Sequence, residues 1–211
     1  VTRRAQELLQ GRQELLDAAR HFSGGLPATV RVGAIPTIAP YLFAELQTKF
    51  RKLLPETALV FDEEVTERLV AGVAKGELEA GILATPLKDT LLDELELFEE
   101  PFLLAVPTRH PLAKRDQVGP KDLESDRLLL LKDTHCLREQ VIGFCSAYQV
   151  EGNRQSAVAS IATLLALVRS NGGVTLIPRM AAGKGANLSG IRCVPISPEP
   201  TRQLRVIFRK T

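Results

Sequence analysis

The sequence predicts an α/β fold of two lobes, and three observations lead to that prediction. Short apolar segments typical of strands alternate with longer segments whose apolar residues recur at helical spacing. This alternation is typical of a parallel sheet covered by helices. The series restarts near residue 102, which predicts a second set of strands and helices. At 211 residues and 45% hydrophobic, the chain is long enough to bury a core.

The first series follows an amphipathic segment, residues 3–22, which we interpret as a linker helix ended by Ser23-Gly24-Gly25. Pro36 and Pro40 separate the first expected strand from the first expected helix. The strands expected in this series are 30–35, 58–61 and 79–83, and the helices are 41–54 and 65–75.

The second series has expected strands at 102–106, 128–131 and 174–177 and helices at 136–148 and 160–170, before a last strand at 202–209. We expect the chain to cross into the second lobe near Glu99 and to return near Arg202, with a separate sheet in each lobe. The first lobe then contains residues 24–98 and 203–211, and the second contains 99–202. A cleft between the carboxyl ends of the strands is where small ligands usually bind.

Composition excludes several classes of function. The formal net charge is +2 and the basic residues are scattered, so this segment alone should bind DNA poorly. Apolar runs stay far below the roughly 18 residues of a membrane span, and no signal peptide opens the sequence, so we expect no membrane partner. Three cysteines, an odd number in a chain too large to need disulfide staples, favour the reducing cytoplasm. The chain starts at Val1 inside an apparent helix, from which we expect a missing N-terminal domain.

Common enzyme signatures are missing from the sequence. It has no P-loop, no GxGxxG after a strand, no GxSxG, no HExxH and no CxxC. His21, His110 and His135 are too scattered to predict a metal site. His110 precedes a proline and is typical of a solvated turn. We therefore expect a protein that is not an enzyme and has no metal or cofactor.

Cys136 is the candidate reactive residue. Asp133 or Thr134 is a suitable N-cap for the following helix, which places Cys136 in or beside its first turn. The helix dipole, His135 and Arg138 would then stabilise a thiolate and lower the pKa of the thiol. The alternative is that Cys136 is a small buried apolar residue.

The other two cysteines have less distinctive surroundings. Cys145 lies among Phe144, Ala147 and Tyr148, which is typical of core packing. Cys193 lies in a short strand-like segment, and we expect it to take no part in the chemistry.

Residues 133–145, with their His-Cys-Leu-Arg and Gly-Phe-Cys elements, closely resemble the redox loop of the peroxide-sensing LysR-type transcription regulators. The stretches 35–42, 76–83, 173–178 and 198–200 resemble the LysR-type effector domain in general. The resemblance implies two Rossmann-like lobes of the type II periplasmic-binding-protein architecture, preceded by a linker helix. It also implies that the family's winged helix-turn-helix precedes this chain, and that the second lobe is the redox lobe.

The resemblance implies a role for each residue of the site. Cys136 would attack peroxide, and Cys145 would resolve the sulfenic acid to an intramolecular disulfide. Four residues match positions that hold peroxide near the thiolate: Thr37, Thr66, His135 and Arg202. Three others would support the thiolate: Thr134, Arg138 and Glu139.

Two of these residues have alternative roles, and the sequence differs from the family pattern at two positions. Thr66 could instead cap a helix, and Arg202 could be a surface charge. Glu139 stands where the family commonly has aspartate, and Thr201 replaces one of two adjacent arginines. Both could change how fast Cys136 reacts.

Three functions follow from this interpretation. The first is a peroxide-responsive transcription activator that pairs as a homodimer, or a tetramer at full length, reaches promoter DNA through the missing domain, and has RNA polymerase as a further partner. The second is a LysR-type sensor of a small metabolite in the interlobe cleft. The third is a thiol peroxidase with sustained turnover. Replacing Cys136 would separate them.

Helix geometry adds one expectation. If Cys136 and Cys145 lie on one continuous helix, nine residues separate them by roughly 13 Å along its axis and place them on opposite faces. A disulfide needs Cα atoms within about 7 Å. The segment must therefore unwind to form the bond, and Gly143 is the expected weak point because glycine disfavours helix.

Overall fold

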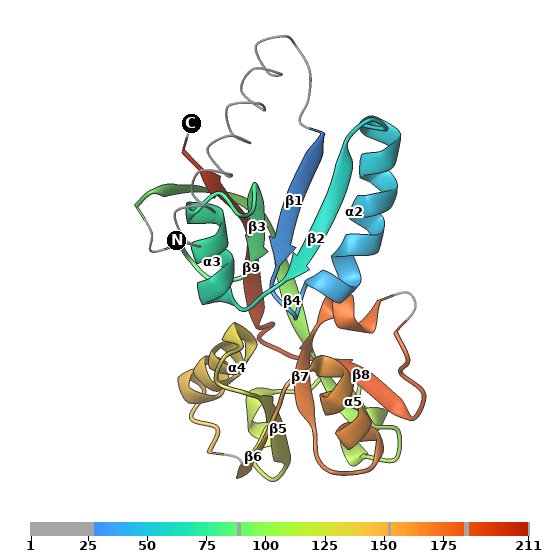
Figure 1. Ribbon diagram of the computed structural model, residues 1–211. Helices are drawn as coiled ribbons and strands as arrows, with labels where there is room; N and C mark the ends of the chain where they lie inside the picture. The colour runs from blue at the N-terminus through green and yellow to red at the C-terminus, as the bar shows by residue number, and fades with distance from the viewer. Residues whose placement is uncertain (1–27, 88–89, 152, 184–185, 211) are drawn as a thin grey trace.

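The structure is a computed structural model that describes residues 28–87, 90–151, 153–183 and 186–210. The linker helix expected over residues 3–22 lies outside the described residues. Figure 1 shows two lobes, one above the other, joined by the strands β4 (Leu92–Pro107) and β9 (Thr201–Arg209). None of the described helices is long and apolar enough to cross a membrane.

The first lobe is a five-stranded mixed sheet flanked by two helices (Figure 1). Its elements, besides the joining strands, are β1 (Thr29–Ala34), α2 (Ala39–Leu53), β2 (Ala58–Glu63), α3 (Thr66–Ala74) and β3 (Ala80–Leu83). Strands β2, β1 and β3 are parallel, and β9 and the first part of β4 extend the sheet antiparallel to β3. Helix α2 begins at Ala39 rather than 41, because Pro40 is well placed in the first turn of a helix.

The second lobe contains the rest of β4 and four further strands. They are β5 (Arg127–Leu131), β6 (Asn153–Val158), β7 (Thr175–Pro178) and β8 (Ile191–Pro195). Its helices are α4 (Cys136–Ala147) and α5 (Ile161–Arg169), with short 3-10 helices η1 (Pro111–Lys114), η2 (Pro120–Leu123) and η3 (Arg179–Ala182). Strands β5 and β6 form a parallel pair.

The prediction of a separate sheet in each lobe is wrong, because β4 belongs to both. Residues 92–101 of β4 pair with β9, and its remaining residues pair with β7 and β8, so the hydrogen-bonded network is continuous. The sequence predicted only the apolar second half of this strand, and it did not predict β6. Two hydrophobic cores remain distinct, one around Leu69, Ile82 and Ile207 and the other around Leu104, Leu128 and Leu164.

Candidate functional site

Cys136 lies at the junction of the lobes. It is the first residue of α4, and its half-buried side chain packs against the core of the first lobe. Leu137, Val141 and Cys145, which share another face of the same helix, are buried in the core of the second lobe. Helix α4 therefore presents one thiol to each core.

The N-cap of α4 differs from the prediction. His135, with extended backbone, is the N-cap residue, and its side chain makes no capping hydrogen bond. The expected caps, Asp133 and Thr134, lie before it. The loop instead closes through the His135 amide, which donates to the Lys132 carbonyl at 3.1 Å. Cys136 is still in the first turn, as the sequence predicted.

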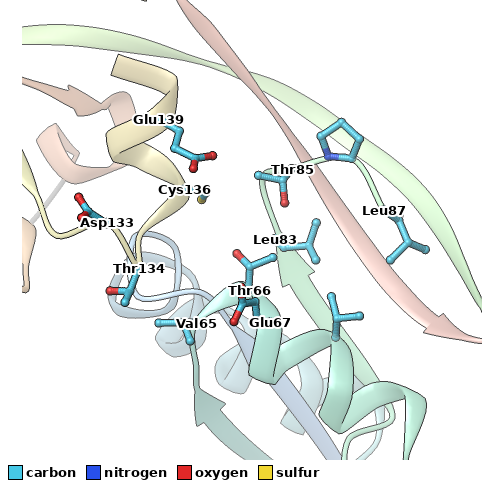
Figure 2. Close-up of a pocket in the computed structure, with 12 residues that line it drawn as sticks. Val65, Thr66, Glu67, Leu83, Thr85, Leu87, Asp133, Thr134, Cys136 and Glu139 are labelled. Atoms are coloured by element: carbon cyan, nitrogen blue, oxygen red, sulfur yellow. The ribbon is translucent and has the colours of Figure 1, made fainter. Parts of the chain in front are cut away.

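Two hollows meet at Cys136. The larger is an open cavity of about 960 Å³ between the N-terminal ends of α3 and α4 and the end of β3 (Figure 2). Its polar lining comes from Thr66, Glu67, Thr85, Asp133, Thr134 and Glu139. The smaller is a narrow hollow, with no room for a water molecule in this conformation, lined by Thr37, Thr66, His135 and Cys136 together with Ile35, Pro36, Val65 and Thr134. The thiol therefore lies beside the open cavity, from which a small molecule can approach it, and beside a narrow hollow that would have to widen to hold one.

Arg202 is buried beside this smaller hollow. Its side chain is fully buried, so the alternative of a surface charge is wrong. Its Nη1 donates to Thr37 Oγ1 at 2.9 Å, and its Nη2 donates to the Thr37 carbonyl at 3.1 Å. Arg202 therefore fixes Thr37, whose hydroxyl belongs to the lining of the hollow.

Burial raises the pKa of the Cys136 thiol above its ordinary value. The Arg202 charge, a hydrogen bond with the Thr66 side chain and the Leu137 amide act in the opposite direction without reversing the effect, and Glu139 raises the pKa further. The prediction of a lowered pKa is wrong for this conformation. Packing of Cys136 against the first-lobe core removes water from the thiol, and residues near Cys136 in the sequence do not reveal this contact.

His135 does not supply the expected positive charge. It is 8% exposed, and burial lowers its pKa below the ordinary value, with Lys132 adding to this effect against a backbone hydrogen bond with Ala159 and the charge of Glu63. His135 is therefore neutral at neutral pH. It can still accept or donate a hydrogen bond in the smaller hollow.

The three residues expected to support the thiolate are placed differently from one another. Arg138 pairs with Asp133, with 2.6 Å between Nε and Oδ1, and its Nη1 donates to the Leu131 carbonyl. Thr134 lines both hollows. The Glu139 carboxylate projects toward the larger cavity in Figure 2, and its charge disfavours the thiolate. Its charge therefore acts against the thiolate, and the supporting role that the resemblance implied stays a prediction.

Thr66 faces the thiol, as the resemblance implied. It is the first residue of α3, whose N-cap is Val65, so the alternative of a capping hydroxyl is not what the structure contains. Thr66 lines both hollows and its side chain hydrogen-bonds with Cys136.

Cys145 is fully buried and lies on the same uninterrupted helix as Cys136. The helix geometry therefore separates the two thiols by roughly 13 Å along its axis, too far for a disulfide. Cys193, on β8, is half-buried and packs against the core of the second lobe. Burial raises the pKa of the Cys193 thiol, which Arg192 partly offsets.

Sequence reasoning missed two residues of the site. Glu100 is 4% exposed and binds Arg202. Gln140, one helical turn after Cys136, donates its Nε2 to the Ala84 carbonyl at 2.7 Å and so links α4 to the first lobe. A glutamate just before the apolar run of β4 was the available signal for Glu100. No group of three His, Cys, Asp or Glu side chains suited to a metal ion occurs within the described ranges.

The rate at which iodoacetamide alkylates Cys136 should rise with pH around a midpoint above the ordinary cysteine pKa. Because burial favours the neutral thiol, the rate should be slow at pH 7 and rise as alkaline pH removes the proton. The pH profile would be measured by mass spectrometry on a Cys145→Ser, Cys193→Ser chain. A midpoint below that of a cysteine peptide would contradict the expected effect of burial.

The fold and site define a class of protein. Residues 23–211 match the LysR substrate binding domain, and the chain belongs to this family. It is 32% identical over 206 residues to the DNA-binding transcriptional dual regulator OxyR of Escherichia coli K12, covering 97% of this chain and 68% of the relative. It is 30% identical over 210 residues to the hydrogen peroxide-inducible genes activator of Dickeya chrysanthemi, covering 99% and 69%.

Solved structures of OxyR are also similar to this chain. The reduced form of OxyR superposes with a TM-score of 0.77 and the oxidised form with 0.75, each at 33% identity and covering 86% of both chains. A cysteine-to-serine variant of OxyR from Corynebacterium glutamicum, bound to H2O2, superposes with a TM-score of 0.85 at 25% identity, covering 97% of this chain and 66% of that one.

Proposed function

We propose that this chain is the regulatory domain of a hydrogen-peroxide-sensing transcription regulator of the LysR type. The observation that carries the proposal is the thiol of Cys136 at the edge of a hollow lined by Thr37, Thr66 and His135, with buried Arg202 behind it. The relatives named as peroxide-inducible activators, and the structural neighbour bound to H2O2, support it.

The chemistry would proceed in two steps. The Cys136 thiolate attacks one peroxide oxygen, the O–O bond breaks, and hydroxide leaves while the sulfur becomes a sulfenic acid. The Cys145 thiolate then attacks that sulfur, the S–O bond breaks, and a second hydroxide leaves as the disulfide forms. Arg202 and the hydroxyl of Thr37 can stabilise the thiolate and the first leaving hydroxide.

A protonated resting thiol fits this role. Because burial keeps the Cys136 pKa high, few thiolates are available to general electrophiles. Peroxide would have to widen the narrow hollow to reach the thiol there, and the hydroxyls of Thr37 and Thr66 and the imidazole of His135 could then hydrogen-bond with it. The sensor would thus gain selectivity by making reactivity depend on occupancy of the hollow.

The remaining parts of the proposal concern assembly. In the full-length protein we propose that a preceding winged helix-turn-helix binds promoter DNA, that the regulatory domain pairs with a second copy, and that oxidation changes the arrangement of the dimer. RNA polymerase contact, activation of transcription and a cytoplasmic location belong to the same proposal, and the relatives named as transcription activators support it.

Intact-mass measurement after brief exposure to dilute peroxide tests the proposal. The wild-type chain should lose two hydrogen atoms, Cys145→Ser should gain oxygen, and Cys136→Ser should do neither. Cys193→Ser is the matched control and should behave as the wild type. Oxidation that persists in Cys136→Ser would refute the assignment.

A metabolite sensor is the second candidate, and the 960 Å³ cavity favours it because peroxide fills little of that volume. A sensor of this kind would keep its response in Cys136→Ser. Without a reductant, both a thiol peroxidase and the proposed sensor should stop after one equivalent of peroxide. With a reductant, a thiol peroxidase would show fast, sustained turnover, whereas the sensor should turn over only as slowly as its disulfide is reduced.

A further inference from the structure

We propose that Glu100 is a positioning residue for the reaction at Cys136, acting through the guanidinium of Arg202. This inference rests on the peroxide-sensing function proposed above. Glu100 does not line either hollow that borders the thiol, and it would contribute by fixing the orientation and balancing the charge of a residue that does act there.

Glu100 and Arg202 form a buried and fully oriented pair. They are 4% and 3% exposed, and they face each other in the register of β4 and β9. Arg202 Nε donates to Glu100 Oε2 at 2.9 Å, and Nη2 approaches the same oxygen at 2.7 Å. A buried charge is costly unless it is paired and hydrogen-bonded, so each residue requires the other.

The second carboxylate oxygen is also engaged. Glu100 Oε1 accepts a hydrogen bond of 2.7 Å from the Met180 amide, at the start of η3 in the second lobe. Glu100 cannot rotate without breaking this bond or the contacts with Arg202. The carboxylate therefore ties both joining strands to the second lobe at one point.

The other side of the guanidinium reaches the reaction site. Arg202 Nη1 and Nη2 donate to the hydroxyl and carbonyl of Thr37, and Thr37 lines the narrow hollow with Cys136. A continuous series of hydrogen bonds thus runs from Glu100 through Arg202 to Thr37. Rotation of the guanidinium would displace the Thr37 hydroxyl from the place where peroxide would bind.

Glu100 should also limit how strongly Arg202 acts on the thiol. Charges that act on the Cys136 thiol come from Arg202 on β9 and Glu139 on α4, while Glu63 and Lys132 act on neighbouring His135. Glu100 neutralises Arg202 at short range and so weakens its attraction for a thiolate. Removal of the carboxylate should therefore make the thiol more acidic, which favours its reaction with any electrophile, and should also disorder the guanidinium, which disfavours its reaction with peroxide.

Glu100→Gln keeps the size of the side chain and removes its charge. The uncompensated Arg202 should lower the Cys136 pKa, so that iodoacetamide alkylation at pH 7 becomes about threefold to tenfold faster. Oxidation by peroxide should not gain in proportion, because it needs the oriented guanidinium and Thr37 hydroxyl. The ratio of the peroxide rate constant to the alkylation rate constant should therefore fall by about tenfold or more.

The experiment measures both rate constants across pH in a Cys145→Ser, Cys193→Ser chain, by quenching and intact mass. Glu99→Gln is the matched control, since Glu99 is the exposed neighbour on the same strand, and it should leave both constants unchanged. Arg202→Gln and the variant that combines Glu100→Gln with Arg202→Gln complete a double-mutant cycle. If Glu100 acts through Arg202, Glu100→Gln should change the ratio less than twofold once Arg202 is replaced.

Several outcomes would overturn the proposal. They are a ratio within twofold of the parent chain in Glu100→Gln, an unshifted alkylation profile, or additive effects in the double variant. If Glu100→Gln does not fold, Glu100→Asp decides: it keeps the charge but not the reach, so its alkylation profile should stay in place while the ratio falls. An unchanged ratio in that variant would also refute the proposal.

Failure of the proposed function gives a different result. If Cys136 in the parent chain reacted with peroxide no faster than a cysteine peptide does, peroxide sensing would be wrong. The alkylation profiles would still show whether Glu100 controls the charge of Arg202 at the thiol.

Discussion

Peroxide is expected to lower hydrogen-exchange protection about 100-fold or more across residues 135–148, and Cys145→Ser is expected to abolish that change. The two thiols lie on one uninterrupted helix and face different cores. Their separation of roughly 13 Å exceeds what a disulfide spans, so α4 must unwind for the bond to form. Unwinding exposes amides that the helix protects.

The loss of packing should be large within this segment and small elsewhere. Leu137, Val141 and Cys145 are each 3% exposed or less, and they leave the core of the second lobe if α4 unwinds. The Gln140 hydrogen bond to Ala84 would break at the same time, which releases α4 from the first lobe. Helix α5, which contributes Leu164 and Val168 to the same core, provides the internal reference.

Cys145→Ser separates the reaction from the refolding. Cys136 should still be oxidised to a sulfenic acid in this variant, which mass measurement would detect, while exchange over residues 135–148 stays at the reduced level. Equal exchange in the oxidised and reduced wild-type chains would rule out the refolding switch. Signalling would then have to come from the sulfenic acid itself.

Regular apolar spacing predicted most of the helices and strands, but it did not predict the charged first half of β4. The β1-α2-β2-α3-β3 order and helices α4 and α5 follow from apolar periodicity, which reflects the faces that these elements bury. The first half of β4 alternates Leu95 and Leu97 with glutamates, but both faces are exposed there. An exposed edge strand leaves little hydrophobic signal in a sequence.

Some features of the site could likewise be predicted from local sequence, and others depend on contacts made by the fold. The position of Cys136 at a helix start depends on neighbouring residues, and the sequence predicted it. The direction of its pKa shift depends on burial against the first lobe, which local sequence does not contain. The partnership of Glu100 with Arg202 joins residues 102 positions apart, so only the pairing of β4 with β9 reveals it.

Two substitutions at Gly143 are expected to move the disulfide equilibrium in opposite directions. Gly143 lies inside α4, is exposed, and a Cβ atom built there meets nothing within 4 Å. Gly143→Ala should therefore stabilise the helix by about 1 kcal/mol without a clash, whereas Gly143→Pro should destabilise it by about 3 kcal/mol through a lost hydrogen bond and a steric conflict with the preceding turn.

These helix energies translate into redox potentials because only the reduced form requires α4 to be intact. Gly143→Ala should make the disulfide easier to reduce, with a potential about 20 mV more positive, and Gly143→Pro should shift it about 60 mV more negative. Equilibration in glutathione buffers of defined potential, followed by intact mass, measures both shifts. Thr48→Ala, at an exposed position of α2, raises helix propensity away from the switch and should leave the potential unchanged. Shifts of the same sign in the two Gly143 variants would mean that unwinding of α4 does not accompany disulfide formation, whereas opposite shifts would identify helix stability as the quantity that sets the sensor's threshold.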